Sequence, residues 1–124
     1  MESWKQFERV LGKMVPGIWE YEVEAEIIAE FIRMGSDGHA YEPIVASGKN
    51  ALILHYVENR DQCRSGDLVL MDLGAEYHGY TADVTRTIPA NGKFSPEQKA
   101  IYDIVYDAQE AGIVASVVGA SFRE

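Results

Sequence analysis

The chain has 124 residues, of which 47% are hydrophobic and 25% charged, so its composition is that of one ordinary globular domain. Its formal net charge of -9 argues against nucleic acid as a partner, because phosphate binding needs a basic surface. The sequence has no apolar run long enough to cross a membrane, and its start lacks the segments of a secretory signal. We therefore expect no membrane partner and a cytoplasmic location.

Two amphipathic helices are predicted at the start of the chain. Apolar residues recur at helical spacing over residues 4–14, until Pro16 and Gly17 interrupt the pattern. A second helix is predicted over residues 21–34, with Gly35 as its C-terminal cap. The acidic side chains of this helix predict a solvated face rather than a metal site, since a run of charges on a helix is usually exposed. They are Glu22, Glu24, Glu26 and Glu30.

The next part of the chain predicts short strands joined by polar segments. A loop over residues 35–41 leads into two apolar runs, PIVAS at 43–47 and ALILHY at 51–56, and the second run contains His55. The polar connection at 58–66 contains Cys63, the one cysteine of the sequence, which excludes an internal disulfide and makes a thiolate zinc site implausible. We expect Cys63 to be an exposed thiol in a reducing compartment.

A last helix is predicted to begin at Ser95. Ser95 is a favourable N-cap, Pro96 follows in the first turn, and Gln98 stands where a capping box needs it. Apolar residues then recur on one side, so we expect the helix to extend toward the C-terminus. The order of two helices, short strands, a hairpin and a helix predicts an α+β fold with antiparallel pairing.

The hairpin is the stretch DLVLMDLGAEYHGYTADVTRTIP, with strands predicted over residues 68–75 and 80–88. If it is symmetric about the bond between Tyr77 and His78, Asp72 lies opposite Asp83. Two carboxylates facing each other on one side of a sheet repel, so a divalent cation or a shared proton is needed to offset the charge. The alternative is that the register differs and both side chains lie on a solvated face.

Other polar residues carry weaker signals. His55 by itself is typical of a hydrogen-bonded histidine at the end of a strand, and Tyr41 is an ordinary aromatic residue. Thr85 shares a strand face with Asp83, so its hydroxyl could support that carboxylate. The sequence contains no G-x-S-x-G, P-loop or H-E-x-x-H motif, so acyl transfer, nucleotide and zincin chemistry have no support.

The hairpin DLGAEYHGYTADVTRT, with VASGKNALILHY upstream and PANGKFSPEQKAIYD downstream, resembles the catalytic domain of the Xaa-Pro aminopeptidases. These belong to the pita-bread metallopeptidases, together with prolidase, creatinase and methionine aminopeptidase. The resemblance runs from about residue 16 to about residue 117. It implies half of a pita-bread fold, an antiparallel sheet with helices packed on one face.

The resemblance also implies roles for individual residues. Asp72 matches the first carboxylate ligand, which binds one metal ion, and Asp83 matches the second, which bridges two ions, usually manganese. His55 matches a histidine that hydrogen-bonds the substrate near the scissile bond, and Thr85 matches a residue that supports the ligand shell. The implied reaction is release of an N-terminal residue preceding proline, by a water that the metals activate.

One departure from the family pattern affects these expectations. The family site also needs a histidine and two glutamates from the second half of its domain, and this sequence has no histidine after His78. We therefore expect residues 1–124 to be the first half of such a domain, inactive alone, binding at most one ion weakly. An apolar face left uncovered could pair two copies as a homodimer. Prolidase and a non-enzymatic protein-binding module of the same fold remain as alternatives.

Overall fold

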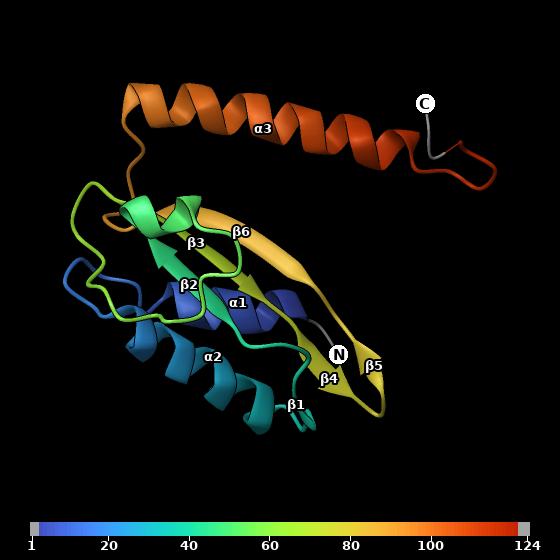
Figure 1. Ribbon diagram of the computed structural model, residues 1–124, viewed down its shortest axis with the longest axis horizontal. Helices are drawn as coiled ribbons and strands as arrows, with labels where there is room; N and C mark the ends of the chain where they lie inside the picture. The colour runs from blue at the N-terminus through green and yellow to red at the C-terminus, as the bar shows by residue number, and fades with distance from the viewer. Residues whose placement is uncertain (1–2, 122–124) are drawn as a thin grey trace. The chain divides into compact units, whose positions relative to one another are not determined.

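The computed structural model describes residues 3–121, with side chains described from Phe7 on (Figure 1). The chain divides into two compact units, Met1–Lys93 and Phe94–Glu124, and each is described by itself. The first unit contains α1 (Ser3–Leu11), α2 (Glu20–Arg33), β1 (Gly38–His39), β2 (Ile44–Ser47), the 3-10 helix η1 (Gly48–Leu52), β3 (Leu68–Leu73), β4 (Ala75–Tyr77), β5 (Tyr80–Thr81) and β6 (Val84–Pro89). The second contains α3 (Pro96–Ala115). Helices and antiparallel strands confirm the predicted α+β class.

Helices α1 and α2 lie along one face of the antiparallel sheet β2-β3-β6 (Figure 1). The apolar stripe of α2 packs there against alternate residues of β3, which places the main core between helices and sheet. The buried residues of this contact are Val23, Ile27, Phe31, Val69, Met71 and Leu73, each at most 2% exposed. Because side chains alternate across a strand, Asp72 lies on the other face of the sheet, away from α1 and α2.

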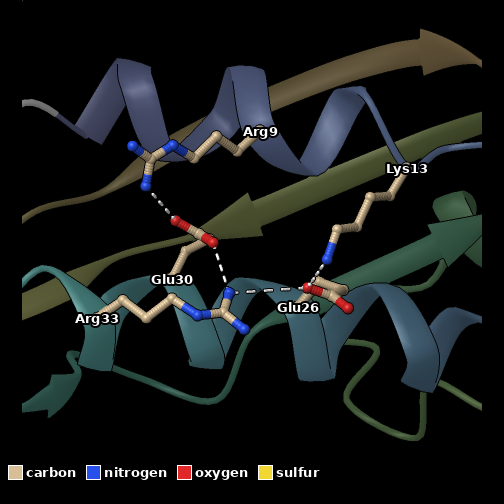
Figure 2. A network of polar contacts seen from close by, with 5 residues as sticks. All are labelled: Arg9, Lys13, Glu26, Glu30 and Arg33. Carbon is tan, nitrogen blue, oxygen red and sulfur yellow. Dashed lines mark hydrogen bonds and ion pairs between the residues drawn. The ribbon is translucent and has the colours of Figure 1, made fainter.

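Polar contacts join α1 and the residue Lys13 that follows it to α2 (Figure 2). Arg9 Nη1 donates to Glu30 Oε2 at 2.9 Å, Arg33 Nη1 donates to Glu30 Oε1 at 2.5 Å, and Lys13 pairs with Glu26. The hydrogen bonds from Arg9 and Arg33 lower the pKa of Glu30. The prediction of a solvated acidic face is wrong at Glu30, which is 7% exposed, because this position faces α1 instead of water.

The C-terminus of α2 ends as the sequence predicts. Gly35 has a φ of +79°, and its N–H donates to Ile32 O while Ser36 N–H donates to Phe31 O. This pair of bonds satisfies carbonyls of the last turn in the manner of a Schellman motif. The cap sends the chain into β1, which pairs with β4.

The predicted hairpin is present, with a different register. Asp72 lies opposite Thr85 in the pairing of β3 with β6. The predicted pairing of Asp72 with Asp83 is therefore wrong by two residues. An even shift leaves every side chain on its expected face, whereas a shift of one residue would have reversed it.

The turn of the hairpin explains the shift. Tyr77 lies opposite Tyr80, so the loop consists of His78 and Gly79 alone. Both have positive φ, 51° and 81°, as the two central residues of a type I′ turn require. The centre of the hairpin is thus the bond between His78 and Gly79, one residue beyond the bond on which the predicted register was built.

The expected strand over residues 51–56 is also wrong. This segment is the end of η1 followed by a turn, with Leu52 86% and Leu54 90% exposed. The loop instead supplies a buried side chain to β2, where Val45 N–H donates to Asn59 Oδ1 at 2.9 Å. Since β2 is an edge strand of its sheet, a side chain here satisfies a backbone donor that no neighbouring strand reaches.

Cys63 is buried, which corrects the expectation of a surface thiol. It is 0% exposed, its N–H donates to Ile18 O at 2.8 Å, and its carbonyl accepts from Gly17 N–H at 2.7 Å. Burial raises the pKa of the thiol to about 11. The polar composition of residues 58–66 does not indicate these backbone bonds to Gly17 and Ile18. The bonds hold Cys63 in the core.

The second unit contains the capped helix that the sequence predicts. Ser95 Oγ accepts from Gln98 N–H at 3.2 Å, and Gln98 Oε1 accepts from Ser95 N–H at 2.9 Å, which completes a capping box. The helix ends at Ala115, and Ser116 is its C-cap. Within residues 3–121, none of the helices combines the length and apolarity that a membrane crossing requires.

Candidate metal centre

A pocket of about 380 Å³ lies on the sheet face that points away from α1 and α2. Its lining residues come from the segment before β2, from β2 and β3, from the link between β5 and β6, and from residues 48–61. They are Tyr41, Glu42, Ile44, His55, Val57, Asp72 and Asp83. We call residues 48–61 the loop at 48–61; it begins with η1 and continues without a strand. The residues that the sequence singles out as two metal ligands and a substrate-binding histidine therefore line one pocket.

The two aspartates converge on a single hydroxyl. Tyr41 Oη lies 2.6 Å from Asp72 Oδ1 and 3.1 Å from Asp83 Oδ1. Asp83 follows Ala82 where the hairpin passes from β5 to β6, so it reaches Asp72 diagonally instead of from the directly opposite position. The expectation that the hairpin brings these carboxyl groups together is confirmed, although the register that suggested it is wrong.

The Tyr41 hydroxyl has one proton for two carboxylates. The shorter contact identifies Asp72 as its acceptor. Burial, followed by the hydrogen bond to Asp72 and the charges of both aspartates, raises the pKa of Tyr41, so the phenol stays protonated. Sequence reasoning missed Tyr41, because a tyrosine in a polar loop has no spacing pattern that ties it to a distant hairpin.

The close approach of Tyr41 and the hairpin depends on Gly74, between β3 and β4. A Cβ at position 74 would lie 1.9 Å from Ala82 O and 2.9 Å from Tyr41 Cε1. The carbonyl of Gly74 also accepts from Ala40 N–H at 2.7 Å, which anchors the chain next to Tyr41. The absence of a side chain at Gly74 thus lets three segments meet beside the carboxylates.

The remaining predicted residues lie beside this pair. His55 reaches the pocket from the loop at 48–61, with its backbone at a φ of +53°. Thr85 lies directly opposite Asp72, on the same face of the sheet. It is therefore the cross-strand partner of Asp72, whereas the sequence suggests that it supports Asp83.

The donor set suits a hard divalent cation. Tyr41 engages Oδ1 of each aspartate, so neither Oδ2 is used by this contact, and carboxylate oxygens are the ligands that such ions prefer. Among residues 3–121 no group of three or more His, Cys, Asp or Glu side chains is placed to hold a metal ion. The described chain therefore offers a pair of carboxylate ligands rather than a closed coordination shell.

The sequence is similar to metallopeptidases of one family. The sequence profile of metallopeptidase family M24 matches residues 4–124. The Xaa-Pro aminopeptidase of Escherichia coli strain K12 is 48% identical over 116 residues, which cover 94% of this chain and 26% of that protein. Xaa-Pro aminopeptidase 1 of Streptomyces coelicolor is 53% identical over 97 residues, or 76% of this chain and 20% of that protein.

Solved structures show the same likeness in three dimensions. The Pseudomonas aeruginosa aminopeptidase PepP matches with a TM-score of 0.93 and 46% identity over 97% of this chain and 27% of that one. Proline aminopeptidase P II from Yersinia pestis matches with a TM-score of 0.83 and 51% identity, covering 85% of this chain and 24% of that one. The predicted fold is confirmed, and the chain spans about a quarter of the length of these relatives.

Proposed function

The chain belongs to metallopeptidase family M24, and on that premise we propose that it supplies part of the catalytic site of an Xaa-Pro aminopeptidase. The substrate is a peptide with proline in the second position, and the reaction releases the residue before that proline. The observation that carries the proposal is the contact of Asp72 and Asp83 with one Tyr41 hydroxyl, in a pocket that His55 also lines.

Asp72 and Asp83 are the proposed ligands of two divalent ions, with manganese as the proposed metal. Both side chains would supply carboxylate oxygens to these ions. When bound, such ions supply an activated water for attack on a carbonyl carbon. The donor chemistry supports this assignment, since two carboxylates held close together in one pocket repel each other unless a cation or proton offsets their charge.

The other pocket residues have supporting roles in the proposal. His55 hydrogen-bonds the substrate near the scissile bond, a role supported by its position in the lining of the same pocket as Asp72 and Asp83. Thr85, opposite Asp72, supports the ligand shell from the neighbouring strand. Tyr41 keeps the two carboxylates together through its hydroxyl.

The described residues provide two carboxylate ligands, so the chain alone is expected to bind one divalent ion weakly and to leave Xaa-Pro peptides uncleaved. Calorimetric titration with MnCl₂ measures the first property. We expect one saturable site, with affinity reduced at least about tenfold in Asp72→Asn and in Asp83→Asn. Asp103→Asn is the matched control, because Asp103 is a half-exposed carboxylate of α3 that pairs with Lys99.

Two results would contradict these expectations. Equal manganese affinity in the parent chain and its three variants would show that the ion binds only through the net negative charge of the surface. Cleavage of a Xaa-Pro peptide that survives repurification and is lost in Asp72→Asn would refute the expectation that this chain is inactive alone.

A further inference from the structure

Glu20, the first residue of α2, is a buried carboxylate whose partners are neutral donors. The residue is 0% exposed. Its Oε1 accepts from the N–H and the hydroxyl of Ser47, both at 2.7 Å, and from Asn50 Nδ2 at 3.1 Å. Its Oε2 accepts from the hydroxyl of Tyr56 and the N–H of Asp61, both at 2.8 Å.

These hydrogen bonds keep Glu20 ionised inside the fold. Burial by itself raises the pKa of a carboxyl group, but the bonds from Ser47, Asp61 and Asn50 outweigh it, and the pKa of Glu20 is lowered. A buried charge without a cation is costly unless several donors surround it. A carboxylate fits this position, since each of these hydrogen-bond partners donates to it.

The donors come from both ends of one loop. Ser47 ends β2 and Asn50 lies in η1, while Tyr56 and Asp61 lie in the second half of the loop. Asn50 Nδ2 also lies within 3.0 Å of Tyr56 Oη and 2.9 Å of Asp61 Oδ2, so the two ends meet around the same carboxylate. The buried carboxylate of Glu20 thus holds the two ends of the loop at 48–61 together.

Apolar packing does not hold the outer part of this loop. Leu52 is 86% exposed, Ile53 55% and Leu54 90%, yet His55 directly follows them and faces the pocket. His55 also adopts a φ of +53°, which a non-glycine residue keeps only when its surroundings impose it. The residue after it, Tyr56, is 7% exposed, so it is the nearest fixed point for His55. Its ring packs in a cluster with Ile44 and Ala46, and its hydroxyl donates to Glu20.

We propose that Glu20 is a positioning residue: through Tyr56, Asn50 and Asp61 it holds the loop that places His55 in the pocket with the two aspartates. The inference rests on the proposed function for the role of His55. It extends that function to a buried carboxylate of α2 that reaches His55 only through other residues.

The test is the Glu20→Gln variant of the same chain, studied by NMR without metal. Glutamine keeps the shape of the side chain, but its NH₂ group replaces one carboxylate oxygen. This NH₂ group would face the donors of the loop, so hydrogen bonds to the loop are lost. We expect amide hydrogen exchange over residues 48–61 to become at least about tenfold faster. The His55 ring signals shift, while the amides of Val69 and Met71 keep their protection.

A manganese measurement reports position directly. Relaxation by Mn²⁺ falls with the sixth power of distance, so the ion at the aspartates broadens the Tyr41 and His55 ring signals in the parent chain. In Glu20→Gln the broadening persists at Tyr41 and weakens at His55. If Glu20 contributed to stability alone, the ratio of the broadening at His55 to the broadening at Tyr41 would be unchanged.

Matched variants complete the experiment. Glu26→Gln makes the same chemical change on the same helix, at a residue that pairs with Lys13, and should leave the loop unaffected. Tyr56→Phe removes one hydroxyl from the network and should shift the His55 signals even if Glu20→Gln fails to fold. Unchanged loop exchange and unchanged His55 signals in a folded Glu20→Gln, or in Tyr56→Phe, would overturn the inference. Absence of manganese binding in the parent chain would overturn the proposed function instead, and the metal-free measurements would still decide the role of Glu20.

Discussion

Substitution of Gly74 by alanine should damage the site more than alanine at any other glycine of this chain, because a Cβ at position 74 meets the shortest contact. A Cβ at position 74 would stand 1.9 Å from Ala82 O, where ordinary contacts begin at 3.4 Å. The carbonyl of Ala82 or the backbone of Gly74 must therefore move by about 1.5 Å. Asp83 is the next residue after Ala82, and its 3.1 Å contact with Tyr41 Oη does not survive a displacement of that size.

The same Cβ would press on Tyr41 Cε1 at 2.9 Å, so both sides of the contact are pushed apart. Forced overpacking costs about 1–3 kcal/mol. With a urea dependence of about 1–3 kcal/mol per molar for a small protein, the midpoint of unfolding should fall by about 1 M. Manganese affinity should fall as well, because the two carboxylates no longer meet.

The matched control is Gly12→Ala, in the same unit. A Cβ at position 12 meets Arg9 O at 3.5 Å, an ordinary contact. Its free energy of unfolding should stay within about 0.5 kcal/mol of the parent value. Equal urea midpoints for Gly74→Ala and Gly12→Ala would refute the argument that position 74 is closed to a side chain.

Three further predictions follow from burial, charge and capping. Cys63 should react with a thiol reagent such as DTNB only after unfolding, because it is buried and its pKa is raised to about 11; fast reaction of the folded chain would contradict its placement in the core. The pKa of Glu20 is lowered from an ordinary value of 4.5, so its contribution to stability is present above that pH and is lost as the pH falls through its lower, folded-state value. Urea midpoints measured at decreasing pH should therefore fall below about pH 4.5 and fall less steeply in Glu20→Gln; parallel curves would count against an ionised Glu20. Ser95→Ala should destabilise the start of α3 by about 1 kcal/mol and speed amide exchange at Gln98, and an unchanged exchange rate would show that the capping box contributes nothing.

Local signals in the sequence predicted the features that depend on neighbouring residues. The helical spacing of α2, the cap at Gly35 and the capping box at Ser95 are all decided within a few positions along the chain. Each of these is present in the structure. The strand at 43–47 is present for the same reason, since its apolar run borders turn-forming residues on both sides.

The features that could not be predicted depend on contacts between distant segments. The run at 51–56 has the composition of a strand, but hydrogen bonds from Asn50 and Tyr56 to Glu20 fold it into a turn. Cys63 lies in a polar stretch, yet its backbone bonds to the residues before α2. Glu30 belongs to an acidic stripe whose exposure depends on where α1 packs. Composition reports none of these partners.

The site itself shows why an incorrect register led to the correct pair of carboxylates. The turn fixes how far one strand is shifted along the other, and a two-residue loop at His78 moved the predicted pairing by two positions. Faces alternate with a period of two, so Asp72 and Asp83 stayed on one face, and the diagonal distance between them is short enough for a single tyrosine hydroxyl to touch both. The face of a strand residue is therefore a safer inference from sequence than its partner across the ladder, and a carboxylate pair can be predicted on that basis. Tyr41, the third member of the contact, could not be predicted, because the loop that carries it meets the hairpin only in the folded chain.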